Sequence, residues 1–210
     1  MTARRIAVYA VVAVAAFVAG LAIARALSRP AAPPPDLTAL LWPSPKAIAP
    51  FSLVDQDGKP FDVERLRGQW TVMFFGYTHC PDVCPTTLST LAAVHDALAS
   101  GGDAERLAVI MVSVDPARDT PERLGQYVRF FGKDFIGVTG PLPDVDVLTR
   151  QLGILYVHHQ PEASGGYLVD HSAGILLVDP QARLVGLFSP PHEAAEIARQ
   201  VRGIRAFIEG

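Results

Sequence analysis

Two continuous apolar segments, each followed by a helix-like pattern, constrain the fold more than any other feature of this chain. Residues 70–77 (WTVMFFGY) and 107–114 (LAVIMVSV) are short and rich in β-branched or aromatic side chains. Such segments are typical of strands that are buried on both faces of a sheet. After each one, apolar residues recur at helical spacing, over 84–98 and over 121–131. We therefore expect an α/β domain whose sheet is covered by helices on both faces.

Further segments predict hairpins, so the sheet should be mixed rather than purely parallel. Residues 51–54 and 61–63 flank an Asp-Gly step that favours a tight turn. Residues 174–178 and 184–188 look like a second strand pair, and a helix is expected near 145–152. An apolar stripe at helical spacing predicts a closing helix at the C-terminus. The expected architecture is a mixed central sheet flanked by helices.

The N-terminal part of the chain divides into an apolar helix and a proline-rich segment. Residues 6–24 carry no charge, and a helix of this length spans roughly 28 Å, close to the roughly 30 Å core of a bilayer. The alternative is a cleaved signal peptide, although this segment exceeds the usual apolar length of about 7–15 residues. Seven prolines within 29–50 indicate an extended spacer. We predict a membrane anchor at 1–28, a spacer at 29–46 and an exported folded domain at 47–210.

The charge distribution and the cysteine content exclude several classes of protein. A formal net charge of −3 rules out a strongly basic nucleic-acid binder. Residues 1–35 hold four arginines and no acidic residue, so the rest of the chain holds fourteen basic and twenty-one acidic residues, a net −7. Two cysteines cannot form the multi-bridge framework of a small secreted scaffold. The predicted domain is therefore acidic, and its cysteines are either incidental or chemical.

Both cysteines lie in GYTHCPDVCP, residues 76–85, where the first predicted buried strand gives way to a helix. Because residues i and i+4 face the same side of a helix, the sulfurs of Cys80 and Cys84 can converge. A helix N-terminus is also expected to lower the thiol pKa, and the thiolate is both the nucleophile and the metal ligand. The pair either cycles between dithiol and disulfide, or joins an imidazole in binding a soft metal such as Cu(I). Zinc stays open as an alternative, with His79 or Asp82 as a fourth ligand.

Residue spacing alone does not decide which histidine would complete such a site. His171 lies just before a predicted strand, and its neighbours Asp170 and Ser172 are of the kind that orient a ligand ring, which modestly favours it. His79 adjoins a cysteine, but adjacent side chains diverge along a strand or tight turn. The other four histidines have simpler explanations as packed, loop or capping residues: His95, His158, His159 and His192.

Three motifs of this sequence resemble those of the Sco/SenC family of copper-binding cytochrome c oxidase assembly proteins. They are GYTHCPDVCP, DPARDTP at 115–121 and VDHS at 169–172, in that order. The resemblance implies a thioredoxin-like fold and copper, with Cu(I) favoured over Cu(II), bound by Cys80, Cys84 and His171. It also implies a single-pass anchor in the inner membrane and a monomeric domain in the periplasm. The implied partners are the copper-accepting subunit of cytochrome c oxidase and a protein that donates the copper.

Three functions of different classes remain open at this point. The first is a metallochaperone, which binds copper and transfers it without catalysing a reaction. The second is a thiol–disulfide oxidoreductase of the thioredoxin-like class that acts through Cys80 and Cys84 on the cysteines of exported partners. The third is a structural or redox-sensing domain without transfer activity. Loss of Cu(I) binding when His171 is replaced would separate the first function from the other two.

Overall fold

The computed structural model describes residues 3–27, 33–100, 107–161 and 166–210, with side chains in the first helix given only within 8–21. The chain divides into two compact units, Met1–Pro34 and Pro35–Gly210. The first unit contains helix α1, Ala3–Leu27, where the sequence predicts a helix over residues 6–24. Among the residues whose side chains are described, which in α1 lie within 8–21, no helix is long and apolar enough to cross a membrane.

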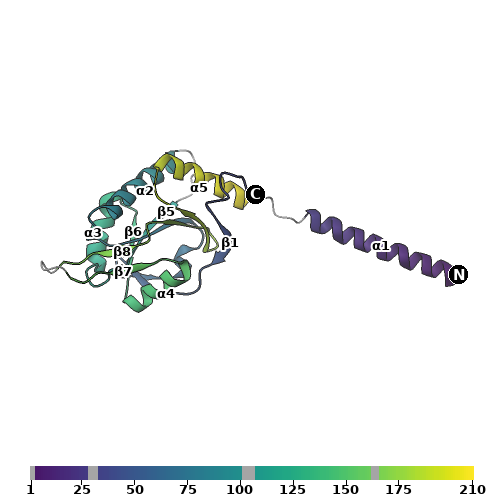
Figure 1. Cartoon of the computed structure of the whole chain (residues 1–210), viewed down its shortest axis with the longest axis horizontal. Helices are drawn as coiled ribbons and strands as arrows, with labels where there is room; N and C mark the ends of the chain where they lie inside the picture. The colour runs from purple at the N-terminus through teal and green to yellow at the C-terminus, as the bar shows by residue number, and fades with distance from the viewer. Residues whose placement is uncertain (1–2, 28–32, 101–106, 162–165) are drawn as a thin grey trace. The chain divides into compact units, whose positions relative to one another are not determined.

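The second unit is built on an eight-stranded mixed sheet (Figure 1). Its strands are β1 (Leu41–Ala47), β2 (Leu53–Asp55), β3 (Pro60–Phe61), β4 (Trp70–Gly76), β5 (Leu107–Ser113), β6 (Ile136–Thr139), β9 (Ile175–Val178) and β10 (Arg183–Phe188). They lie in the order β1-β10-β9-β4-β5-β6-β2-β3. The pairs β4–β5 and β5–β6 are parallel and the others are antiparallel, which confirms the predicted mixed sheet.

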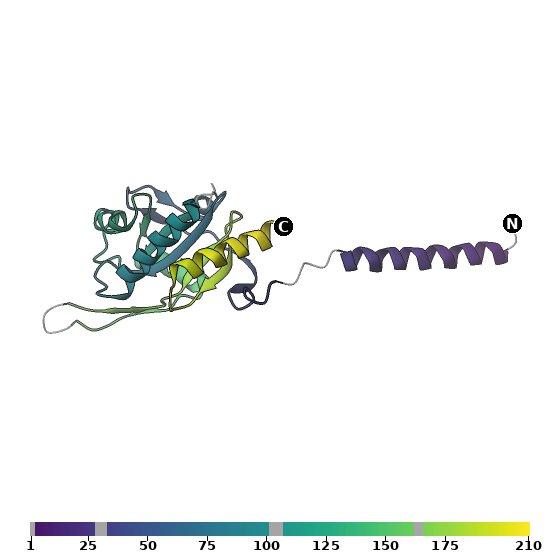
Figure 2. The ribbon, with the colours of Figure 1, turned by 90° about the horizontal axis from the view of Figure 1, so that it is seen from above.

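Helices cover both faces of this sheet, as the apolar strands require. They are the short 3₁₀ helix η1 (Val63–Leu66), α2 (Val83–Ser100), α3 (Pro121–Phe131), α4 (Leu142–Leu152) and α5 (Ala194–Glu209). Figures 1 and 2 show α2 and α5 side by side on one face of the sheet, and α3 lies next to α2 on that same face. Helix α4 lies on the opposite face. Thr120 caps α3 by accepting a hydrogen bond from the Arg123 N–H, and Pro121 takes the first helical position, where its missing N–H costs nothing.

The centre of the sheet places the carboxyl ends of two parallel strands next to each other. Every residue of β4 is buried, so this strand lies in the core with helices on both sides. Its neighbour β5 runs parallel to it, and the N–H of Val114, the residue after β5, donates to the carbonyl of Gly76, the last residue of β4. The loops that follow β4 and β5 therefore start side by side at one edge of the sheet. This edge is where open α/β sheets commonly place their functional groups.

The predicted proline-rich spacer extends too far toward the domain. Residues 41–47 form strand β1, which pairs with β10, although the sequence assigns residues 29–46 to the spacer. Two prolines fit in β1 because it is an edge strand, where a missing N–H can face solvent, and its register is irregular between Leu41 and Lys46. Leu37 is also buried, so the described chain joins the folded unit before β1 begins.

Two short strands that the sequence does not predict form a second, separate sheet. Strand β7 (Tyr156–His158) pairs antiparallel with β8 (Val169–His171), and neither pairs with the central sheet. His171 is the last residue of β8, and it also lies just before β9, the strand that the sequence predicts after it. Figures 1 and 2 show this hairpin reaching out beyond the helices of the domain.

Candidate metal centre

The two cysteines lie at the junction between β4 and α2. Cys80 is part of the connecting loop, where its N–H donates to the Tyr77 carbonyl, and Cys84 is in the first turn of α2. The Cys84 N–H donates to the Cys80 sulfur at 3.4 Å, so this sulfur satisfies a backbone donor at the start of the helix. Both thiols are free. The predicted convergence of the two sulfurs is confirmed, although only Cys84 belongs to the helix.

Core packing fixes the position of the Cys84 sulfur. The residue is fully buried beneath Gly76, the last residue of β4. A Cβ atom at Gly76 would lie 2.7 Å from this sulfur and 2.8 Å from the Phe74 ring, so only glycine leaves room for it. Burial raises the pKa of the Cys84 thiol, because the charged thiolate loses its hydration. The predicted lowering of its pKa is therefore wrong for Cys84: desolvation raises the pKa more than the backbone hydrogen bond from Tyr77 lowers it.

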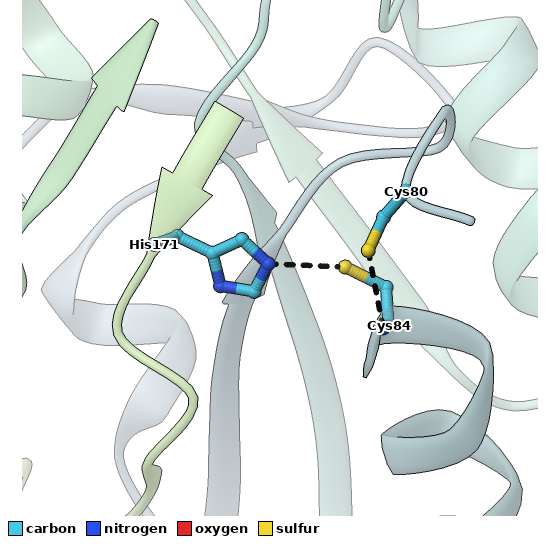
Figure 3. Close-up of side chains that lie close together, drawn as sticks. All are labelled: Cys80, Cys84 and His171. Carbon is cyan, nitrogen blue, oxygen red and sulfur yellow. Dashed lines mark hydrogen bonds between the residues drawn. The ribbon is translucent and has the colours of Figure 1, made fainter. Parts of the chain in front are cut away.

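His171 approaches the cysteines from the separate hairpin. Its Nε2 atom lies 3.3 Å from the Cys84 sulfur (Figure 3). Its Nδ1 atom lies 3.2 Å from the Ser172 carbonyl oxygen, which can only accept, so Nδ1 carries the proton and Nε2 offers its lone pair to the sulfur side. Burial lowers the pKa of the imidazole and keeps it neutral, the form that binds metals.

The three ligand atoms lie close enough to share one ion. Those of Cys80, Cys84 and His171 are all within 4.8 Å of one another, and the described residues contain one such group. Two sulfurs and one imidazole form a donor set that favours soft metals such as Cu(I). The proposed fourth ligands for zinc are not part of it. His79 contacts Thr78 and Arg123 instead, at 3.2 Å each, and Asp82 is exposed on the loop.

Aromatic rings that the sequence argument missed enclose the imidazole. Phe74 and Tyr77 meet the His171 ring edge-on, with centroids 5.8 and 6.0 Å away. The Tyr77 hydroxyl also accepts a hydrogen bond from the Val169 N–H of β8 at 3.3 Å. Both aromatic residues belong to the predicted buried strand or follow it directly. The sequence did place both aromatic residues beside the cysteine motif. It could not show that their rings contact a histidine, because His171 lies 94 residues after Tyr77.

The remaining histidines lie outside the cluster of ligand atoms. His95 packs against Phe135, with ring centroids 6.1 Å apart, which fits its predicted place at the edge of the core. His158 and His159 lie near different carboxylates. The Nε2 atom of His158 is 3.9 Å from Asp115 Oδ1, and the Nε2 atom of His159 forms a hydrogen bond with Asp170 Oδ2 at 2.7 Å. His192 bonds the Ala173 carbonyl at 2.8 Å, and the cap position of α5 belongs to the residue after it.

A groove of about 850 Å³ lies beside the metal centre rather than at it. Residues of the loops after β5 and β6 and of the β7–β8 hairpin line it, including Pro116, Pro141 and Tyr167. None of the three clustered ligand residues lines this groove. The volume is that of a small-ligand pocket, but the three residues that could bind a metal lie outside it.

The fold and the cluster together define an α/β domain with a candidate soft-metal site of two cysteines and one histidine. A family model described as SCO1/SenC matches residues 43–206. The chain therefore belongs to the SCO1/SenC family, as its three motifs predicted.

Curated relatives and solved structures agree with this assignment. A protein of Stutzerimonas stutzeri whose name assigns it copper binding is 40% identical over 152 residues, 72% of this chain and 74% of the relative. The structure of Arabidopsis thaliana ScoI with copper bound is 35% identical, with a TM-score of 0.69 over 74% of this chain and 99% of that chain. Bradyrhizobium japonicum ScoI with copper bound is also 35% identical, with a TM-score of 0.66 over 74% and 98%. The chain spans about half the length of the mitochondrial SCO1 homologues of mouse and human, 54% and 50%.

Proposed function

We propose that this chain is a copper metallochaperone that holds one copper ion through Cys80, Cys84 and His171. The convergence of these three ligand atoms within 4.8 Å is the observation that carries the proposal. The copper-bound structures of two similar Sco proteins support copper as the metal. Copper is the cargo here, so a site from which it can leave is part of the function.

We further propose Cu(I) as the form that is carried. Two thiolates and a neutral imidazole are soft or borderline donors, and a set of three ligands is too few for a closed structural zinc site. Because Cys84 is buried and its thiol pKa is raised, binding must displace its proton. A soft metal that bonds strongly to sulfur can compensate for that loss, whereas a hard cation cannot.

The acceptor and the location belong to the same proposal. We propose the copper-accepting subunit of cytochrome c oxidase as the partner, because the motifs resemble those of a family of oxidase assembly proteins. The uncharged residues 6–24 support a membrane anchor, and the acidic domain would then lie in the periplasm. Membrane fractionation of cells that express the full chain, with protease added to intact spheroplasts, tests this location: a soluble or protected domain would refute it.

Titration of the reduced full-length protein with Cu(I) against a chromophoric chelator tests the copper site. We expect one tightly bound Cu(I) per chain, with binding abolished in Cys80→Ser and Cys84→Ser and strongly weakened in His171→Ala. The matched control is His159→Ala, which removes an exposed imidazole from the same hairpin and leaves the cluster intact. An unchanged affinity in His171→Ala would refute the three-ligand site.

The oxidoreductase remains the second candidate, because two free thiols lie four residues apart at a helix start. The thioredoxin-like fold implied by the resemblance would suit it. Its expected signature is turnover of a disulfide substrate that persists in His171→Ala and stops in either cysteine variant. The raised pKa of Cys84 argues that this thiol is not the attacking one, so Cys80 would form the mixed disulfide.

A further inference from the structure

The hairpin that carries His171 is fastened to the domain by side chains. In the described part of the chain, its two strands pair only with each other. Three hydrogen bonds of tyrosine hydroxyls join the hairpin to the rest of the domain. Tyr77 accepts from the Val169 N–H, Tyr156 donates to Asp146, and Tyr167 donates to Asp115. A lone two-stranded hairpin is marginally stable in water, so these contacts matter for where it lies.

The Tyr167 contact is the most elaborate of these fastenings. The Tyr167 hydroxyl donates to Asp115 Oδ1 at 2.6 Å, and the Arg118 Nε donates to Oδ2 of the same carboxylate at 2.5 Å. The Arg118 guanidinium also lies 3.6 Å from the centre of the Tyr167 ring, within the range of a cation–π contact. The Asp115 side chain is fully buried, so a lost partner would leave an unsatisfied charge.

The same loop also holds the cysteine half of the site. The Ser113 hydroxyl accepts from the Asp115 N–H and donates to Asp119. The buried Asp119 carboxylate accepts from both the N–H and the hydroxyl of Thr78, at 3.0 and 2.6 Å. Thr78 lies two residues before Cys80. A continuous chain of hydrogen bonds therefore runs from the histidine hairpin to the cysteine loop.

We propose that Tyr167 is a positioning residue for the metal ligand His171, acting through Asp115 and Arg118. The DPARDTP segment then holds the two halves of the metal centre in register, with Asp115 on the histidine side and Asp119 on the cysteine side. This inference rests on the proposed copper function. It assigns to Tyr167 no contact with the metal itself, because its hydroxyl is bonded to Asp115.

The test is a double-mutant cycle in the full-length protein, with Cu(I) affinity measured by chelator competition. Outer partners of metal ligands typically contribute about 10–100-fold to affinity, so Tyr167→Phe should weaken Cu(I) binding about tenfold. In a His171→Ala background the same change should alter the affinity by no more than about twofold, because the ligand it positions is gone. A merely structural role would lower the affinity in both backgrounds.

The matched control is Tyr127→Phe. It removes a hydroxyl from a tyrosine of α3 that has no hydrogen-bond partner among the described residues, and it should leave the affinity unchanged. Wild-type affinity in Tyr167→Phe, beside a weakened His171→Ala, would overturn the positioning role alone. The positioning role would also be overturned if Tyr127→Phe lowered the Cu(I) affinity as much as Tyr167→Phe does. The same holds if Tyr167→Phe lowered the affinity equally with and without His171. Failure of the wild-type protein to bind Cu(I) would instead refute the proposed function.

Discussion

Replacing Gly76 by alanine should displace the Cys84 sulfur and so weaken metal binding. The added Cβ would lie 2.7 Å from the Cys84 sulfur and 2.8 Å from a Phe74 ring atom. Non-bonded heavy atoms settle at about 3.5–4.0 Å, so the sulfur must move by about 1 Å. A binding constellation tolerates about 0.5 Å of displacement, and the sulfur would leave the position from which it meets His171. We expect Cu(I) affinity to fall by at least about tenfold.

The same substitution should also lower stability, because the site is part of the core. Overpacking a filled core typically costs about 1–3 kcal/mol. For a chain of this size, each kcal/mol corresponds to a melting temperature lower by about 2–4 °C. Gly186→Ala is the control: it adds the same methyl group to β10, where the nearest atoms would lie 3.4 and 3.5 Å away.

Two measurements on the metal-free full-length proteins separate these effects. Thermal unfolding reports the cost in the core, and chelator competition reports the affinity for Cu(I). We expect Gly76→Ala to change both, and Gly186→Ala to change neither. If Gly76→Ala bound Cu(I) as tightly as the wild type and melted at the same temperature, the Cys84 sulfur would not be packed against β4, and the account of its burial would be wrong.

Three further predictions concern reactivity, pH and local stability. At about pH 8, iodoacetamide should modify the partly exposed Cys80 well before Cys84, since burial raises the Cys84 thiol pKa; mass spectrometry that found equal rates would contradict this. Burial raises the pKa of Tyr156 to about 12, and the hydrogen bond to Asp146 adds to this shift. The protonated hydroxyl therefore contributes its full stabilisation below pH 10.0, the pKa of tyrosine in the unfolded chain, and this stabilisation is lost as the pH rises toward 12. Denaturant titrations should show that decline in the wild type and a smaller one in Tyr156→Phe, and identical slopes would count against it. Amides of β7 and β8 should exchange hydrogen much faster than those of β4, and equal protection by mass spectrometry would show that the hairpin opens only with the whole domain.

Local sequence patterns were sufficient to predict the central elements and one half of the site. Continuous apolar strands and the helical stripes after them carry their structure in residues close together in the chain, and β4, β5 and α2 lie where these patterns place them. The four-residue spacing of Cys80 and Cys84 is local too, so the convergence of their sulfurs could be predicted. His171 was only modestly favoured by its neighbours, and the family resemblance singled it out. The contact between α2 and a hairpin 87 residues later is not encoded in any local period.

The failed expectations share a physical cause, which is tertiary context. A helix N-terminus alone would lower a thiol pKa, but the Cys84 sulfur is buried under a strand, and desolvation decides the direction. Prolines alone indicate a spacer, but an unpaired side of β10 accepts residues 41–47 as an edge strand. In both cases the residue type was interpreted correctly, and the surroundings that overruled it come from distant parts of the chain.

The two halves of the metal centre are held by different kinds of contact, and this difference bears on the proposed carrier function. Moving the Cys84 sulfur requires repacking of a filled core, at a cost of roughly 1–3 kcal/mol before any bond to copper is counted. Moving His171 requires the separation of side-chain hydrogen bonds, which contribute about 0.5–1.5 kcal/mol each between neutral groups and about 1.5–3 kcal/mol where one partner is charged, as at the buried Asp115. Under the proposed function, we expect an acceptor protein to displace the histidine side, because hydrogen bonds can be exchanged for others one at a time, whereas a filled core cannot. We therefore predict that copper leaves through loss of the imidazole first, so Tyr167→Phe should raise the rate at which bound copper is released to a chelator.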